Sequence, residues 1–212
     1  MNGKVNLALG LIVFFLAGVA AYYLTEQQAR DDSAPDVPVP TASAPSTDTQ
    51  EAPPGVTNLG EFELPDLSGT LRHSSEWDGK ARMVNFWATW CAPCRREIPL
   101  LKKTQEEHGA ENVQVIGIAV DFPEEVTAYA EEVQFNYPVL IGQEEAMAVA
   151  ETSGVDFIGM PFTMIVAPGG ELIKAHIGEI VESHIEEILH VFAALEAGSM
   201  DIDGAREALS SL

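Results

Sequence analysis

The stretch Asn85-Phe86-Trp87-Ala88-Thr89-Trp90-Cys91-Ala92-Pro93-Cys94-Arg95-Arg96-Glu97-Ile98-Pro99 joins a short apolar run to the two cysteines of the chain. The run begins at Met83, and its length suits a buried strand over 83–87. A helix is predicted to follow over 92–107 and to end at His108-Gly109. Pro93 fits the first turn of that helix, where its missing N–H costs no hydrogen bond. The sequence therefore places both cysteines at a turn from strand to helix.

Strands and helices alternate along the rest of the chain. A helix is opened by Asp121-Phe122-Pro123-Glu124, which offers an N-cap residue and an early proline. Pro168-Gly169-Gly170 signals a hairpin between the last two strands. The other strands are predicted over 113–120, 137–141, 163–167 and 171–177, and the other helices over 144–152 and 181–195. This order predicts an α/β fold, with a central mixed sheet and helices on both faces.

The two cysteines are suited to thiol chemistry. Only two are present, three positions apart, so a disulfide-stapled framework is excluded. At a helix N-terminus, unpaired N–H groups favour the thiolate of Cys91. Cys94 lies one turn further in and is predicted to be the thiol that resolves a mixed disulfide with a partner.

Cys-x-x-Cys is also the spacing of half a zinc site. The five histidines show no compact spacing that would complete such a site, which favours redox chemistry over a structural metal. A copper chaperone that uses both thiolates and His176 is a third interpretation. The sequence predicts no cofactor and no bound metal.

The charge of the chain excludes one class of partner. The formal net charge is −22, from 33 Asp and Glu against 11 Lys and Arg. Such a chain repels phosphate backbones, so no nucleic acid partner is expected. The charge is interpreted as a contribution to solubility.

The N-terminal part is predicted to be a membrane anchor, residues 1–26. Residues 5–24 carry no charge and match the roughly 20 residues that a helix needs to cross a bilayer. Lys4 precedes the run and acidic residues follow it, so the rest of the chain is expected outside the cytoplasm. The alternative is a cleaved signal peptide, with small residues at Gly18-Val19-Ala20, but the apolar run is longer than usual for one.

Three further segments follow the anchor. Residues 27–58 are rich in Pro, Ala, Ser and Thr and are predicted to be a disordered linker. Residues 59–192 form the predicted globular domain. Residues 193–212 are an acidic C-terminal extension, with a possible amphipathic helix around 205–209 and no assigned role.

The stretch 85–99 resembles the active-site segment of TlpA-like and ResA-like thioredoxins. Phe62-x-Leu64-x-Asp66-Leu67-x-Gly69 upstream, and Gly154-Val155 and Gly159-Met160-Pro161 downstream, also match, so the resemblance covers about 59–192. It implies a thioredoxin-like fold. The segment 121–141 resembles the extra αβ unit of the TlpA-like branch. Peroxiredoxins share the fold, but their Pro-x-x-x-Thr-x-x-Cys motif is absent from this chain.

The resemblance also implies roles for individual residues. Pro161 is expected to be a cis-proline that faces the disulfide, which makes the backbone of Met160-Pro161 a docking edge for substrate. Trp90 is expected to be a surface aromatic that contacts partners, with Pro93 beside it in the substrate-binding set. Pro99 corresponds to a proline that kinks the active-site helix.

Other side chains of the stretch are interpreted from their residue types. Phe86 and Trp87 are expected in the core. Arg95 and Arg96 are expected in solvent, and Glu97 is left ambiguous.

Two departures from the family bear on proton transfer. Cytosolic thioredoxins have a buried Asp where this chain has Asn85, which cannot titrate. The Glu that ResA-like members can carry between the cysteines is replaced by Ala92-Pro93. The proton acceptor for Cys94 is therefore open, with water or Glu63 as candidates. A third departure, Phe162 after the cis-proline position, makes the groove more apolar.

The resemblance implies a protein-disulfide reductase that uses Cys91 and Cys94. Its expected partners are disulfide-containing extracytoplasmic proteins, of the cytochrome c maturation or copper-site assembly type, and a membrane-embedded thiol electron donor. Its expected place is the bacterial inner membrane, with the catalytic domain facing the periplasm. The alternatives are a disulfide oxidase or isomerase, and a tethered metallochaperone or binding module without catalysis.

Overall fold

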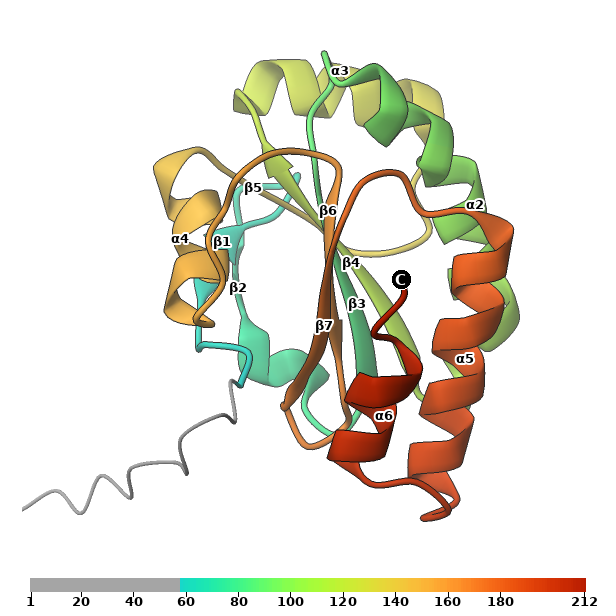
Figure 1. Cartoon of the computed structure of the whole chain (residues 1–212). Coiled ribbons are helices and arrows are strands. Elements are labelled where there is room, and N and C mark those ends of the chain that lie inside the picture. The colour runs from blue at the N-terminus through green and yellow to red at the C-terminus, as the bar shows by residue number, and fades with distance from the viewer. Residues whose placement is uncertain (1–57) are drawn as a thin grey trace, which may run out of the picture. The chain divides into compact units, whose positions relative to one another are not determined.

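The computed structural model describes residues 58–212, and a five-stranded mixed sheet is the centre of this part of the chain (Figure 1). The strands lie in the order β5-β4-β3-β6-β7. β3, β4 and β5 are parallel, and β6 and β7 run antiparallel to their neighbours. The predicted mixed sheet is confirmed. The strand bounds are Ala81–Trp87 (β3), Val113–Val120 (β4), Val139–Gly142 (β5), Phe162–Val166 (β6) and Leu172–Ile177 (β7).

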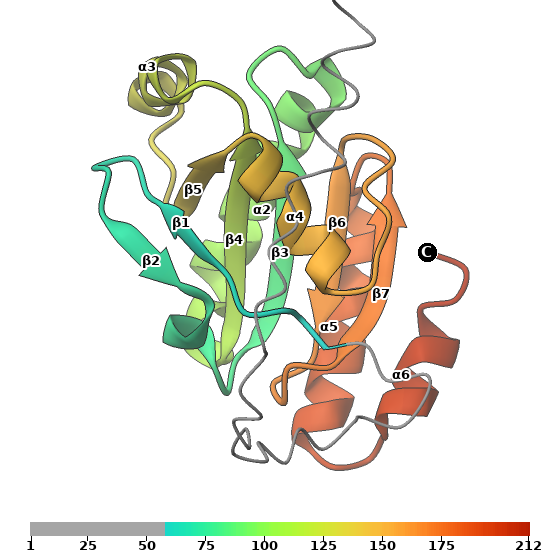
Figure 2. The ribbon, with the colours of Figure 1, turned by 90° about the vertical axis from the view of Figure 1, so that its left-hand side faces the viewer.

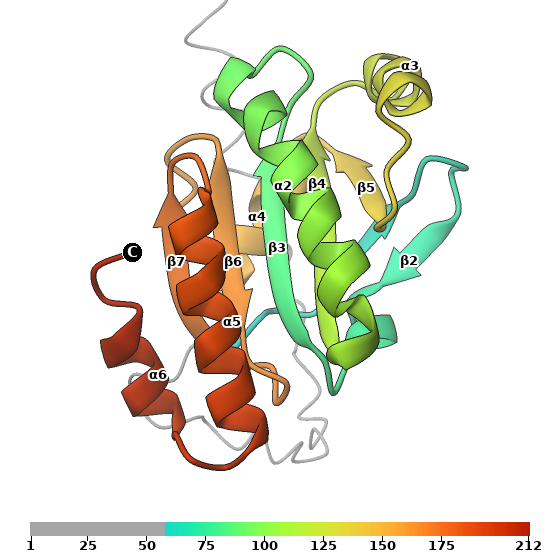
Figure 3. The same ribbon diagram turned by 90° about the vertical axis from the view of Figure 1, so that its right-hand side faces the viewer.

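Helices cover both faces of the sheet. Figure 3 shows α2 and α5 lying across one face, with α6 beside β7 and α5. Figure 2 shows α4 and the small β1–β2 hairpin on the other side. α3 lies next to α2, where Arg95 of α2 sits over the Tyr129 ring of α3. The bounds are Ala92–His108 (α2), Pro123–Val133 (α3), Glu144–Thr152 (α4), Glu182–Glu196 (α5), Ile202–Ala208 (α6), Glu63–Pro65 (β1) and Leu71–His73 (β2), with short 3₁₀ helices at Ser74–Trp77 and Gly109–Glu111.

The sheet separates two hydrophobic clusters because successive side chains of a strand point to opposite faces. On β3, Met83 and Trp87 belong to the cluster under α2 and α5. Val84 and Phe86 belong to the cluster under α4 and the hairpin. A strand with both faces covered is apolar on both sides, which explains why the run around Asn85 is otherwise apolar.

Asp121 has a different role from the one predicted. The N-cap position of α3 is Phe122, and no side chain caps that helix. The Asp121 carboxylate instead accepts hydrogen bonds from Thr89, in the loop before the cysteines. The acidic residue after β4 therefore holds a neighbouring loop, and Pro123 starts the helix.

The C-terminal extension closes one side of the domain. α5 continues to Glu196, and α6 then packs back with Ala205 and Leu209 fully buried. Arg206 donates hydrogen bonds to the carbonyl of Leu172 on the edge strand β7. An extension in this place keeps the edge of the sheet from pairing with another chain.

The predicted membrane anchor and all of the linker except its last residue lie outside the described residues. Within 58–212, no helix has both the length and the apolar character needed to cross a membrane.

Candidate active site

The two cysteines form a disulfide at the N-terminus of α2. Cys91 is the N-cap residue, Cys94 lies in the first turn, and their Cα atoms are 5.3 Å apart. The backbone N–H of Cys94 donates to Sγ of Cys91 at 3.3 Å. Cys91 is 6% exposed and Cys94 is fully buried. In the reduced pair, this N–H and the helix dipole would favour a thiolate on Cys91, which agrees with the prediction that Cys91 attacks and Cys94 resolves.

The loop before the cysteines is fixed from the neighbouring strand. Oδ2 of Asp121 accepts from the backbone N–H of Thr89 at 2.9 Å and from its hydroxyl at 2.6 Å. β3 and β4 are parallel, so the residues that follow them meet at one edge of the sheet. The positions of Thr89 and Asp121 just after two neighbouring strands could have predicted this contact, but it was not predicted.

The docking edge predicted from the resemblance lies in the segment before β6. The Met160-Pro161 peptide bond is cis, as expected. The Pro161 carbonyl accepts from the N–H of Gly178 at 2.9 Å, which ties this segment to the loop after β7. Among the described residues, no hydrogen bond reaches the backbone of residues 156–160. Within residues 58–212, the N–H and C=O groups of Met160 therefore have no hydrogen-bond partner, which agrees with the predicted docking edge.

Glu97 is a buried carboxyl one turn beyond Cys94 on α2. Its side chain is 1% exposed. Oε1 accepts from Nδ2 of Asn85 at 2.8 Å, and Oε2 accepts from the backbone N–H of Ile180 at 2.6 Å. Burial raises the pKa of Glu97 to about 7, against the lowering effect of these two hydrogen bonds. A carboxyl with this pKa can take up and release a proton near neutral pH.

The structure favours Glu97 over Glu63 as the candidate proton acceptor for Cys94. Glu63 lies in β1, and its carboxylate pairs with His73 at 3.0 Å. Residues i and i+3 of a helix are neighbours, which places Glu97 next to Cys94. The role of Glu97 could not be predicted from the sequence, because the spacing alone does not tell a buried helix face from an exposed one.

The other predicted side chains divide as their types suggested. Phe86 and Trp87 are fully buried. Arg95 and Arg96 are exposed, and Arg96 pairs with Glu179. Pro99 lies inside α2, and Pro93 is half-buried in its first turn.

Exposed apolar side chains lie at the end of the sheet that carries the disulfide. Trp90, directly before Cys91, is 69% exposed. Five of the seven large exposed hydrophobic residues in the described part lie at this end of the sheet: Trp90, Phe122, Ile158, Ile177 and Val181. We call these five residues the apolar rim. Its side chains come from the loops after β3 and β4, the segment before β6, the last residue of β7 and the region after β7.

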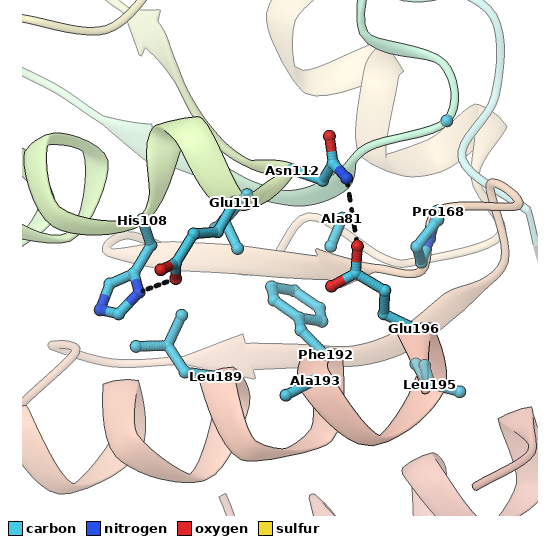
Figure 4. Close-up of a pocket in the computed structure, with 12 residues that line it drawn as sticks. Ala81, His108, Glu111, Asn112, Pro168, Leu189, Phe192, Ala193, Leu195 and Glu196 are labelled. Atoms are coloured by element: carbon cyan, nitrogen blue, oxygen red, sulfur yellow. Dashed lines mark hydrogen bonds and ion pairs between the residues drawn. The ribbon is translucent and has the colours of Figure 1, made fainter. Parts of the chain in front are cut away.

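A hollow of about 360 Å³ lies at the opposite end of the sheet (Figure 4). Ala81 and Val113, at the starts of β3 and β4, line it together with Phe192 of α5. His108 pairs there with Glu111, and Asn112 bonds to Glu196. The hollow contains none of the predicted site residues.

No metal-binding group was found in the described part of the chain. Among residues 58–212, no three His, Cys, Asp or Glu side chains cluster in a way that could hold a metal ion. His176, considered above as a copper ligand, packs its ring against His184 with 4.9 Å between the ring centroids.

Comparisons with known proteins agree with this geometry. The sequence model of the AhpC/TSA family matches residues 57–175. Thiol-disulfide oxidoreductase ResA of Halalkalibacterium halodurans is 30% identical over 116 residues, which are 54% of this chain and 64% of the relative. Thioredoxin-like protein YneN of Bacillus subtilis is 31% identical over 121 residues, 55% of this chain and 68% of the relative.

A solved structure shows the same fold. The crystal structure of a thiol:disulfide interchange protein of the thioredoxin family from Chlorobium tepidum TLS superposes with a TM-score of 0.59 at 27% identity. The match covers 66% of this chain and 97% of that structure. The chain spans slightly less than two thirds of the ResA relative named above. The chain belongs to the AhpC/TSA family and has a thioredoxin-like fold.

Proposed function

We propose that this protein is a thiol:disulfide oxidoreductase that reduces disulfides of partner proteins through Cys91 and Cys94. The observation that carries the proposal is the cysteine pair at the N-terminus of α2, with a buried carboxyl of raised pKa one turn away. The names of the relatives support the same reaction class.

The reaction begins with the Cys91 thiolate. It attacks one sulfur of the substrate disulfide, and the other substrate sulfur leaves and takes a proton. Cys94 then gives its proton to Glu97 and attacks Sγ of Cys91, which releases the second substrate sulfur as a thiolate. This thiolate takes up a proton from water, and Glu97 returns its proton to water before the next turnover. Two electrons pass from the dithiol to the substrate, and the Cys91–Cys94 disulfide remains. A donor dithiol must reduce this disulfide before the next turnover.

The apolar rim and the Met160 backbone suit an extended substrate segment with apolar side chains. An extended segment could pair with the free N–H and C=O of Met160 while apolar side chains next to its cysteine contact Trp90 and Ile158. Such a segment is more accessible in an unfolded or loosely folded partner. The cytochrome c maturation or copper-site assembly proteins inferred from the resemblance remain proposals for its identity.

The proposed place of action is the outer side of a bacterial inner membrane. The uncharged run 5–24 would anchor the chain, and a membrane-embedded thiol donor would regenerate the dithiol. Disulfide exchange with such partners suits a compartment outside the reducing cytosol.

The direct test is turnover of insulin disulfides by the full chain with dithiothreitol as donor. Cys91→Ser is expected to lose exchange by a factor of roughly 1000 or more, because the attacking sulfur is gone. Cys94→Ser is expected to accumulate a mixed disulfide with substrate, since nothing resolves it. Turnover by Cys91→Ser at the rate of the unmodified protein would contradict the proposal.

The reduction potential of the Cys91–Cys94 disulfide decides whether the protein reduces or oxidises its partners. A value near that of thioredoxin, about −270 mV, supports reduction of partners, whereas a value near about −120 mV supports an oxidase. A purified protein that holds one metal ion on its dithiol and does not turn over would support the metallochaperone.

A further inference from the structure

The hydrogen-bond partners of Glu97 suit its ionised form, because both of them are donors. Its two oxygens accept from Nδ2 of Asn85 and from the backbone N–H of Ile180. Both of these groups are donors and neither can accept a proton. Protonation adds an O–H donor to this buried carboxyl, and neither of its present hydrogen-bond partners can accept from it. In the proposed reaction, however, Glu97 must gain and lose a proton in every turnover.

Asn85 contains the atom that could resolve this conflict. Its Nδ2 donates to Oε1 of Glu97 at 2.8 Å and to Oγ1 of Thr163 at 3.0 Å. Its Oδ1 is buried and accepts no hydrogen bond from any described residue. Rotation of the amide by half a turn exchanges these two atoms with almost no change in shape.

We propose that Asn85 is a positioning residue that reverses its side-chain amide when Glu97 gains a proton, so that Glu97 and Thr163 stay hydrogen-bonded to it in both protonation states. In the reversed orientation, the Glu97 O–H and the Thr163 O–H both donate to Oδ1. The Thr163 hydroxyl permits this because it can either accept or donate. Each orientation makes two hydrogen bonds to these neighbours and leaves one amide atom unpaired. This inference rests on the proposed function, since it assumes that Glu97 receives the proton of Cys94.

The reversal gives a reason for Asn at position 85. An ionised Asp there could not donate to Glu97, and two buried carboxylates would repel one another. An apolar residue would leave the carboxyl without its partner in either state. Asn provides a donor and an acceptor from one place and does not itself titrate.

Few other charged or titratable groups face Glu97. Glu179, from the loop after β7, raises the pKa of Glu97 and is itself paired with Arg96 of α2. Tyr137, two residues before β5, is buried, and its phenol has its pKa raised by burial and by Glu97. Thr163 on β6 and Asn85 on β3 are neutral. The disulfide lies on α2 itself.

The test is a nuclear magnetic resonance titration of the full chain between pH 5 and pH 9. The carboxyl carbon of Glu97 reports its protonation. Cross-peaks between the Asn85 NH₂ protons and the side chain of Thr163 report the amide orientation. We expect these cross-peaks at pH 9 and expect them to be several-fold weaker at pH 5, with the same midpoint as the carboxyl.

Two variants sharpen the test. In Glu97→Gln, the new amide can accept from Ile180 N–H and donate to Oδ1 of Asn85, so the low-pH pattern is expected at every pH. In Glu179→Gln, the midpoint of the amide change is expected to move to lower pH together with that of the carboxyl, because a negative charge near Glu97 is removed.

Two results would overturn the inference. One is an unchanged Asn85–Thr163 pattern while Glu97 titrates, and the other is a Glu97 carboxyl that stays ionised throughout. Neither result affects the cysteine chemistry, which insulin turnover by the same protein measures separately. Loss of that turnover would instead contradict the proposed function.

Discussion

The two ends of the central sheet differ in how their polar groups are satisfied. At the end with the starts of β3 and β4, the hollow is lined by pairs such as His108–Glu111 and Asn112–Glu196, which are exposed to solvent. At the disulfide end there is a fully buried carboxyl, a buried amide oxygen without a hydrogen bond, and an apolar rim on the surface.

The hollow and the proposed reactive site therefore lie at opposite ends of this protein. Small-molecule sites are usually hollows, but a protein disulfide must approach an accessible sulfur on a surface. The useful signal is a titratable group held in a costly environment beside a nucleophile. No cysteine lines the hollow, whereas the N-terminal part of α2 holds Glu97 one turn from Cys94.

The largest effect that tests this contrast is expected for Glu97→Gln on stability. The folded state raises the pKa of Glu97 from 4.5 to about 7, so it binds the proton more tightly than the unfolded chain does. The free energy of unfolding of the unmodified protein should therefore fall as pH rises from about 4.5 to about 7, by roughly 3 kcal/mol for this group. Glu97→Gln has no carboxyl at this position, so its free energy of unfolding does not fall for this reason. The free energy of unfolding of the variant, minus that of the unmodified protein, should therefore rise by roughly 3 kcal/mol between pH 4.5 and pH 8.5.

Urea unfolding of the oxidised proteins at several pH values measures the difference. Glu106→Gln, on the exposed part of the same helix, is the control for removal of one acidic residue. If the two proteins differ in free energy of unfolding by the same amount at all pH values, then burial does not raise the pKa of Glu97.

A smaller effect is expected at the surface of the disulfide end. Trp90→Ala removes a large exposed ring next to Cys91 without disturbing the core. We expect kcat/KM for a protein disulfide to fall roughly tenfold, mostly through KM, because aromatic side chains dominate contact energies at interfaces. Trp90→Phe should recover most of the loss. An equal fall with a small disulfide such as oxidised dithiothreitol would indicate damage to the cysteines instead of lost contact.

The strands and helices could be predicted from the sequence because apolar runs, and the Gly and Pro residues between them, are local features of the sequence. The run 113–120 and the segment 144–152 were predicted with the bounds of β4 and α4. Asp121 was placed wrongly because two roles, helix cap and partner of a neighbouring loop, have the same sequence signal. The first depends on local spacing, whereas the second depends on β3 and β4 lying side by side.

The proton acceptor could not be predicted for a similar reason. Glu97 follows two arginines on a helix, a pattern typical of a solvent-exposed face. Its burial results from packing against Asn85 of β3 and Ile180 of the loop after β7, which is 83 residues further along the chain. Its pKa depends on that burial, so no local pattern contains it.

The smallest effect is expected at the hollow end. Glu196→Gln keeps an oxygen that can accept from Nδ2 of Asn112 and removes only an exposed charge. The free energy of unfolding should change by less than about 0.5 kcal/mol, as for most surface substitutions. Insulin turnover should be the same as that of the unmodified protein within error, because Glu196 lines the hollow at the other end of the sheet. A clear loss of turnover in a variant that unfolds at the same urea concentration would show that the two ends are coupled, and the contrast drawn between them would then be wrong.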